Sequence, residues 1–168
     1  MLLNLRQLFL EEGKSISFDE IMPNTAEKLW DGHPIASPIN LLGTVTNRAG
    51  IVTLDYTAAF RFVSQCDRCC EDVDRQMTYR FEHTLVQQLE NEDDDDGYLV
   101  LPDLNLDMEE LAASDISLEL PSKVLCSEDC KGLCPKCGKN LNEGSCGCPT
   151  KEVDPRLAKL LQLLEKDN

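Results

Sequence analysis

Six of the nine cysteines lie in one stretch of 23 residues, Cys126 to Cys148, which reads C-SED-C-KGL-C-PK-C-GKNLNEGS-C-G-C. In its C-P-K-C-G turn, Cys134 and Cys137 direct two thiolates at one point, and the glycine lets backbone N–H groups face the sulfurs. Such a turn supplies half of a tetrahedral zinc site, which Cys146 and Cys148 are near enough in sequence to complete. A site of four thiolates has no open coordination position, so we expect it to stabilise structure and to carry out no chemistry.

A second C-x₂-C pair, Cys66 and Cys69, has the same spacing, and nine cysteines permit two sites of four thiolates with one residue over. Once the local site is complete, Cys126 and Cys130 have no further partners nearby in sequence. Cys66 and Cys69 can be those partners if the intervening chain returns to them. The spare is Cys70, expected to point away from its neighbour in an extended strand. A reduced hairpin turn without metal is the alternative for the second site. The predicted ligands are Cys134, Cys137, Cys146 and Cys148 for site 1, and Cys66, Cys69, Cys126 and Cys130 for site 2.

The two cysteines of the second pair lie between segments that alternate between apolar and polar residues. This period of two predicts two strands that form a long antiparallel hairpin with the C-D-R-C turn at its tip. The apolar face of the first strand has Val52, Leu54, Tyr56, Ala58, Phe60 and Phe62, and that of the second has Val73, Met77, Tyr79, Phe81 and Leu85.

Weaker patterns predict the remaining elements. Strands are expected over 15–21, 39–45 and 98–101, a turn over 47–50, and a helix over 108–120 capped by Asn105 or Asp107. Residues 2–9 fit a helix or a strand equally well. A C-terminal helix is expected after Asp154-Pro155, with an apolar stripe that packs on its own domain more often than on a partner; the stripe is Leu157, Leu160, Leu161 and Leu164.

Together these elements predict an α+β fold, mostly antiparallel sheet, in three parts. Residues 1–125 form the sheet domain with an acidic loop at about 90–97, residues 126–150 form the zinc-binding cysteine cluster, and residues 151–168 form the terminal helix. The run Glu90 to Asp96 is expected to be a solvated loop, because the spacing of a calcium-binding loop is absent.

Charge and cysteine content limit the compartment and the partners. The net charge of −15 resides in residues 1–125, which hold nine basic and 24 acidic residues, since from Cys126 onward seven of each balance. Phosphate repels such a chain as a whole, so contact with RNA requires a local basic patch or a basic protein. With no signal peptide and no membrane span in the sequence, nine cysteines indicate a reducing compartment, and we expect a cytoplasmic protein.

Patterns typical of enzymes are missing from the sequence: it has no Walker loop, no G-x-S-x-G and no deaminase motif. His83 is expected to be a core residue rather than a ligand. A thiol oxidoreductase is the third function considered. The C-x₂-C motif of such an enzyme lies at the N-terminus of a helix, whereas Cys66 and Cys69 lie between strands. The candidate RNA contacts are Arg68 and the lysines of an acid-free stretch, Lys131, Lys136 and Lys139.

Several motifs along the chain fit one known pattern: C-D-R-C, D-I-S-L-E-L-P, L-C-S-E-D-C-K-G-L-C-P-K-C-G-K-N-L-N, C-G-C and D-P-R-L-A-K-L, together with the opening L-N-L-R-Q-L-F and S-I-S-F. In these motifs the chain resembles the YceD family, the large ribosomal RNA subunit accumulation proteins. The resemblance covers essentially the whole chain. Cys70 departs from the pattern, where an aliphatic residue is expected, and leaves the choice of ligand between Cys69 and Cys70 open.

The resemblance implies a bacterial or plastid-type cytoplasmic protein without catalytic activity that is required for 23S ribosomal RNA to accumulate. It therefore implies a factor in large-subunit assembly that acts on 23S rRNA or a pre-50S particle. It also implies a genomic neighbour that encodes a small zinc-ribbon protein of the large subunit. The alternative function, favoured by the negative charge, is an acidic, zinc-containing binding module for a basic ribosomal protein of the large subunit.

Overall fold

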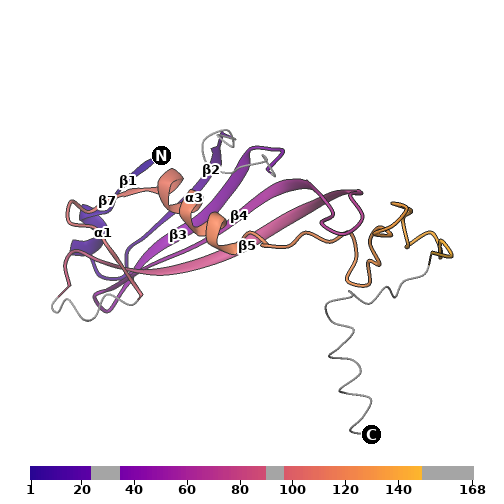
Figure 1. The fold of residues 1–168 in the computed structure, drawn as a ribbon. Helices are drawn as coiled ribbons and strands as arrows, with labels where there is room; N and C mark the ends of the chain where they lie inside the picture. The colour runs from indigo at the N-terminus through magenta and orange to yellow at the C-terminus, as the bar shows by residue number, and fades with distance from the viewer. Residues whose placement is uncertain (24–34, 90–96, 149–168) are drawn as a thin grey trace, which may run out of the picture.

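The computed structural model describes residues 1–23, 35–89 and 97–148. It shows a curved sheet, and the stretch Cys126–Cys148, called the cysteine segment below, extends from one end of it (Figure 1). The main sheet has the order β2-β3-β4-β5-β6, and β1 and β7 form a separate pair. Two helices, α1 and α3, complete the regular structure of the described residues. The expected α+β class is therefore correct, while the acidic run at 90–96 and the terminal helix lie outside the described residues.

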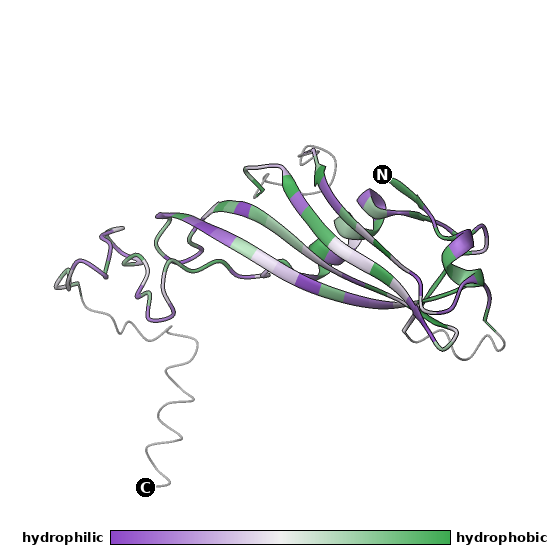
Figure 2. Cartoon of the chain, turned by 180° about the vertical axis from the view of Figure 1, so that it is seen from behind, coloured by the Kyte–Doolittle hydropathy of each residue, from purple (hydrophilic) through white to green (hydrophobic). Residues whose placement is uncertain are grey.

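The longest elements are β4 (Ile51–Gln65) and β5 (Asp72–Val86), which pair antiparallel from Val52↔Leu85 to Gln65↔Asp72. Every apolar residue predicted for one face of β4 is buried, and the predicted face of β5 is buried or partly buried. The alternation along the strands is visible in the hydropathy colouring (Figure 2). The predicted hairpin is confirmed, with residues 67–69 as its tip.

β2 (Ser15–Met22) and β3 (Ile39–Arg48) extend the sheet antiparallel on the other side of β4. The predicted turn at 47–50 joins β3 to β4, and both of its central residues have positive φ, +52° at Ala49 and +80° at Gly50. Positive φ at both central positions is the geometry of a tight two-residue hairpin turn, which matches the twist of the flanking strands. Asn47 fixes the turn by accepting a hydrogen bond from the Gly50 N–H and donating one to the Leu8 carbonyl.

The undecided N-terminal segment contains both kinds of structure, β1 (Leu2–Asn4) followed by α1 (Arg6–Leu10). β1 pairs antiparallel with β7 (Asn105–Asp107), and β6 (Tyr98–Val100) joins the edge of β5 in parallel orientation. The sheet is therefore mixed at this edge. Neither helix in the described part of the chain has the length and apolar character needed to cross a membrane.

Helix α3 (Met108–Glu119) covers the core face of the sheet and is capped by Asp107, whose carboxylate accepts from the Glu109 N–H. Its buried residues include Asp115, whose Oδ2 accepts from the Tyr56 hydroxyl at 2.5 Å and lies 2.7 Å from His83 Nε2. Burial first, and then this carboxylate, raise the pKa of Tyr56, so its hydroxyl stays protonated and donates. His83 is thus half-buried at the edge of the core, and its partner is a helix carboxylate.

Candidate metal centres

Site 2 forms where the tip of the hairpin meets the segment that follows α3. The Sγ atoms of its four predicted ligands all lie within 4.8 Å of one another. Two of the separations are 3.8 Å, from Cys66 to Cys130, and 3.5 Å, from Cys69 to Cys126. A zinc ion with sulfur ligands at about 2.3 Å in a tetrahedron would set the sulfurs roughly 3.8 Å apart. The four sulfurs therefore have the spacing that such an ion requires.

Hydrogen bonds to the tip bring the returning chain to site 2. The Asp67 N–H donates to the Val124 carbonyl at 2.8 Å, and the Val124 N–H donates to the Asp67 carboxylate at 2.7 Å. Arg75 donates to the Leu125 carbonyl, and Arg68 donates to the Cys130 carbonyl at 2.7 Å. α3 thus returns the chain to the hairpin tip, which was the condition for pairing these cysteines.

Site 1 is local, and the Sγ atoms of its four predicted ligands also lie within 4.8 Å of one another. The Gly138 N–H donates to the Cys134 carbonyl at 2.9 Å, and Gly138 has a φ of +72° that favours glycine. Leu133 and Asn140 form an isolated antiparallel bridge that closes the chain over the turn. Both predicted quartets are therefore assembled side by side at one end of the molecule.

The thiols within each quartet have divergent acidities. Burial opposes ionisation of Cys66, but hydrogen bonds from the backbone of Arg68, Cys126 and Cys69 outweigh it and lower its pKa to about 6. Backbone hydrogen bonds from Cys137 and Lys136 lower the pKa of Cys134 to about 6. Hydrogen bonding with the neighbouring sulfurs of Cys137 and Cys146, and then burial, raise the pKa of Cys148 to about 12.

This divergence follows from crowding, because four thiolates cannot ionise at one point without a cation between them. Backbone hydrogen bonds favour the thiolates of Cys66 and Cys134, and a hydrogen bond from the Asn142 side chain favours that of Cys130. Each such negative charge hinders ionisation of the neighbouring sulfurs. A divalent ion reverses the hindrance, since it favours the thiolate of every ligand that it contacts. The donor sets therefore fit a thiophilic divalent metal, and zinc is the ion that four thiolates in a tetrahedron favour.

Cys70 belongs to neither quartet, since the structure places Cys69 in site 2 and leaves Cys70 exposed. The reason differs from the expected one, because Cys70 has a φ of +60° and is not extended. The backbone turns at this residue, and its N–H donates to the Cys66 carbonyl at 2.9 Å. All nine cysteines are free of disulfides.

The four arginines of the hairpin all make contacts within the fold, which the sequence did not indicate. Arg61 and Arg80 form ion pairs with Asp74 and Asp55, while Arg68 and Arg75 donate to backbone carbonyls of the returning segment. Among the predicted RNA contacts, Arg68 is therefore already engaged through its guanidinium. The predicted lysines lie on the exposed surface of the cysteine segment, where Lys139 also approaches the Ser145 carbonyl at 3.4 Å.

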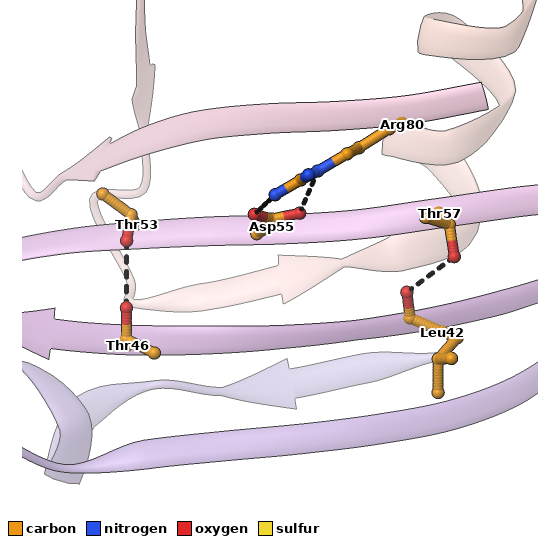
Figure 3. Close-up of polar contacts among 6 residues, drawn as sticks. All are labelled: Leu42, Thr46, Thr53, Asp55, Thr57 and Arg80. Atoms are coloured by element: carbon orange, nitrogen blue, oxygen red, sulfur yellow. Dashed lines mark hydrogen bonds and ion pairs between the residues drawn. The ribbon is translucent and has the colours of Figure 1, made fainter.

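The face of the sheet opposite α3 carries a groove of about 670 Å³ with many hydroxyl groups. Thr46 and Thr53 pair through their hydroxyls, Thr57 donates to the Leu42 carbonyl, and Arg80 binds Asp55 through two nitrogens (Figure 3). The aromatic residue at this groove, Tyr56, is only 1% exposed and directs its hydroxyl to α3. In the described residues this groove therefore offers no ring on which a base could stack, the usual device of RNA-binding sheets.

A second groove, of about 390 Å³, lies between α3 and the strands β1, β6 and β7. Its lining combines five leucines with two carboxylates; the lining residues are Leu2, Leu99, Leu101, Asn105, Leu106, Asp107, Glu110, Leu111 and Ser114. The sequence from 90 to 122 contains twelve acidic residues and no lysine or arginine. Sequence reasoning found the acidic character but not this groove, because its walls come from segments distant in sequence.

The fold and the two quartets define a sheet protein that carries a cysteine-rich segment on the tip of its longest hairpin. A family model described as "Large ribosomal RNA subunit accumulation protein YceD" matches residues 54–164, about two thirds of the chain, including all nine cysteines. The chain belongs to the YceD family, which confirms the resemblance.

Relatives extend from bacteria to plants. "Uncharacterized protein YlbN" of Bacillus subtilis (strain 168) is 28% identical over 164 residues, 96% of this chain and 95% of that protein. "Uncharacterized protein ML1660" of Mycobacterium leprae (strain TN) is 32% identical over 139 residues, 78% of this chain and 61% of that protein. The chloroplastic "Large ribosomal RNA subunit accumulation protein YCED homolog 1" of Arabidopsis thaliana is 39% identical over 51 residues, 30% of this chain and 16% of that protein. No solved structure matches the chain.

Proposed function

We propose that this chain is a non-enzymatic factor in large-subunit biogenesis that supports the accumulation of 23S ribosomal RNA in the cytoplasm. Membership of a family named for large ribosomal RNA subunit accumulation carries this proposal. Two features of the chain support it: each cysteine quartet has the four donors of a closed, structural site, and nine free cysteines suit a reducing compartment.

The proposed cofactor is structural zinc, one ion per quartet, at site 1 and site 2. Four sulfurs would fill the coordination sphere of each ion, so neither site would have a position for substrate or water. A thiol oxidoreductase is disfavoured, because Cys66 and Cys69 lie at a hairpin tip with two further cysteines within 4.8 Å. The role of the metal would be to order the cysteine segment at the end of the sheet.

The RNA contact is proposed for the cysteine segment, through Lys131, Lys136 and Lys139, with Arg68 contributing less because its guanidinium is engaged. From Lys131 to Lys139 no acidic residue interrupts the positive charge, whereas acidic residues dominate the sheet domain. A metal-ordered loop would present these charges at fixed spacing to phosphates of a pre-50S particle.

The second candidate function is a binding module for a basic ribosomal protein of the large subunit, such as a small zinc-ribbon protein. The groove beside α3 favours it, because leucines next to Asp107 and Glu110 suit a lysine- or arginine-rich segment with apolar side chains. No basic residue occurs between positions 90 and 122 to oppose such a partner.

Crosslinking in cells, with sequencing of bound RNA and identification of bound proteins, separates the two candidates. Replacing the three lysines by glutamate should remove the 23S rRNA crosslinks and, for the purified protein, flatten the salt dependence of RNA binding. The groove variant, Leu2→Ser with Glu110→Lys, alters two residues that line the groove beside α3 and should leave RNA binding unchanged. Neutralising Asp93 to Asp96 should slow only association with a basic protein at low salt.

The result that would overturn the leading proposal is specific. If neither the wild-type chain nor any variant yields 23S rRNA crosslinks, and the groove variant loses a basic ribosomal protein, the second function replaces the first. The control is Leu118→Ser, which removes a leucine that is 83% exposed on α3 but does not line the groove.

A further inference from the structure

Only three residues, Lys131, Gly132 and Leu133, separate the last ligand of site 2 from the first ligand of site 1. This connection packs against the hairpin tip, where the Leu133 N–H donates to the Arg68 carbonyl at 2.9 Å. Gly132 has a φ of +74°, and a Cβ there would come within 2.8 Å of the same carbonyl oxygen. The two sites therefore share a short, closely packed piece of backbone and cannot move independently.

One side chain connects the sites directly. Asn142 lies in the loop 138–145, whose two ends are joined to Cys137 and Cys146 of site 1. Its Nδ2 donates to the Sγ of Cys130 in site 2 at 3.3 Å, and its Oδ1 accepts from the Lys131 N–H at 2.7 Å. A loop that belongs to site 1 thus supplies a hydrogen-bond donor to a ligand of site 2.

Further hydrogen bonds set the position of this asparagine. The Asn142 N–H donates to the Asn140 side chain at 3.0 Å, and the Asn140 amide donates to Glu71 on the hairpin tip at 2.9 Å. The Leu141 N–H donates to the Gly132 carbonyl at 2.9 Å. The position of the Asn142 amide against Cys130 is therefore set jointly by these hydrogen bonds and by the site 1 cysteines at the two ends of the loop.

We propose that Asn142 is a positioning residue for site 2 and that it makes metal binding at the two sites cooperative. The inference rests on the zinc binding proposed above. Filling site 1 fixes the ends of the loop, which holds the Asn142 amide against the thiolate of Cys130. A hydrogen bond to a charged ligand stabilises its thiolate form and fixes its orientation, and losing such a contact typically costs about 10- to 100-fold in metal affinity.

The test uses the full chain under reducing conditions, with zinc as the probe at free concentrations set by a competing chelator. Amide hydrogen exchange reports each site separately: residues 66–71 follow site 2, and residues 134–146 follow site 1. Asn142→Ala should raise the free zinc needed to protect residues 66–71 by about tenfold or more, and leave the site 1 midpoint unchanged. The matched control is Ser145→Ala, a truncation in the same loop that touches no ligand of site 2 in the described residues.

A mutant cycle then tests the route of the coupling. Cys146→Ser with Cys148→Ser should weaken zinc binding at site 2 by at least as much as Asn142→Ala does, although no site 2 ligand is changed. Adding Asn142→Ala to that variant should raise the free zinc needed at site 2 by no more than about twofold further, because site 1 no longer fixes the ends of the loop. Since Asn142→Ala alone keeps both quartets, a folding failure of the double serine variant would leave the test intact.

Three outcomes contradict the proposal in distinguishable ways. An unchanged site 2 midpoint in the double serine variant would show that the sites are independent. A site 2 midpoint for Asn142→Ala equal to that of Ser145→Ala would remove the asparagine from the coupling. Absence of any zinc-dependent protection in the wild-type chain would overturn the zinc sites themselves, and the coupling with them.

Discussion

Six even-numbered residues of β4, from Val52 to Phe62, are buried hydrophobic side chains, whereas Cys126 to Cys148 buries only Cys130, Gly132 and Cys134. The sheet domain gains its stability from apolar area removed from water, which amounts to about 25 cal/mol for each Å². The cysteine segment has no comparable area, and its Leu133 is 38% exposed. One chain thus combines a region that can fold through its own core with a region that needs another source of order.

The junction between these regions is narrow and largely polar. Besides the sulfurs of site 2, it includes the hydrogen bonds between Asp67 and Val124, the contacts of Arg68 and Arg75 with backbone carbonyls, the hydrogen bond from the Leu133 N–H to Arg68, and the contact of Glu71 with Asn140. No strand of the sheet continues into residues 121–148. We therefore expect a disturbance of the cysteine segment to reach the tip of the hairpin and to fade along it.

The largest expected effect comes from removing metal. The protein purified under reducing conditions without chelator should contain two zinc ions, and chelation should remove hydrogen-exchange protection from residues 126–148. The sheet should survive, because its core consists mainly of hydrophobic side chains, and the site 2 ligands that join this core, Cys66, Cys69 and Cys130, lie at the hairpin tip. Protection at 52–62 should therefore stay close to that of the loaded protein, while protection at 64–72 falls.

Two results would contradict this division between the regions. A metal content of one ion would remove site 2 and retain site 1, and a content of zero would remove both. Uniform loss of protection across residues 50–86 on chelation would show that the sheet itself depends on the metal.

The difference between the regions also explains what the sequence could predict. The hairpin and both quartets leave local signatures, since alternation identifies a half-buried strand and C-x₂-C spacing identifies a knuckle turn. The parallel pairing of β6 and the groove beside α3 leave none, because they join segments far apart in sequence. The functions of Arg68 and Arg75 were missed for the same reason: the carbonyls that they contact arrive with the returning segment.

Asp115 was missed although a signal existed. It follows Met108 and Ala112 on the buried side of α3, and His83 lies on the apolar face of β5. Two ionisable residues at positions that periodicity assigns to the core indicate a buried pair, since either alone would be costly to bury. Searching predicted core faces for complementary polar residues would have found this contact.

The second prediction concerns this contact inside the sheet domain. Asp115→Ala leaves the Tyr56 hydroxyl buried without its acceptor and should lower the free energy of unfolding by about 2 to 3 kcal/mol. Denaturant unfolding of the zinc-loaded protein measures the loss, with exposed Ser114→Ala as the neighbouring control. Zinc content should not change, because Asp115 contacts Tyr56 and His83, which are ligands of neither site; loss of zinc in this variant would show that the two regions fold as one.

The third prediction acts at the junction. Gly132→Ala forces a side chain onto a backbone with φ of +74° and within 2.8 Å of the Arg68 carbonyl oxygen, a strain of about 1 to 3 kcal/mol. We expect weaker zinc retention and faster exchange at residues 66–71, with sheet stability unchanged. Gly13→Ala is the matched control, because it has a φ of +78° but no atom within 4 Å of the added Cβ. Equal effects of the two substitutions on zinc retention would contradict close packing at this connection.

The smallest expected effect is on the open face of the sheet, at the ion pair of Asp55 with Arg80 (Figure 3). The hydrogen bond from Arg80 holds the pKa of Asp55 below its ordinary value, so the folded state favours the carboxylate and the pair adds stability above that ordinary value. The contribution should fall as the pH drops through the folded pKa, below about 4, and should shrink in high salt because both side chains are well exposed. Unfolding of the wild type and Asp55→Asn, compared between pH 3 and pH 7, should therefore differ slightly at neutral pH and converge in acid. A difference that grows toward acid would contradict the lowered pKa of Asp55. A difference that exceeds the effect of Asp115→Ala would show that this exposed ion pair contributes more to stability than the buried contact of α3.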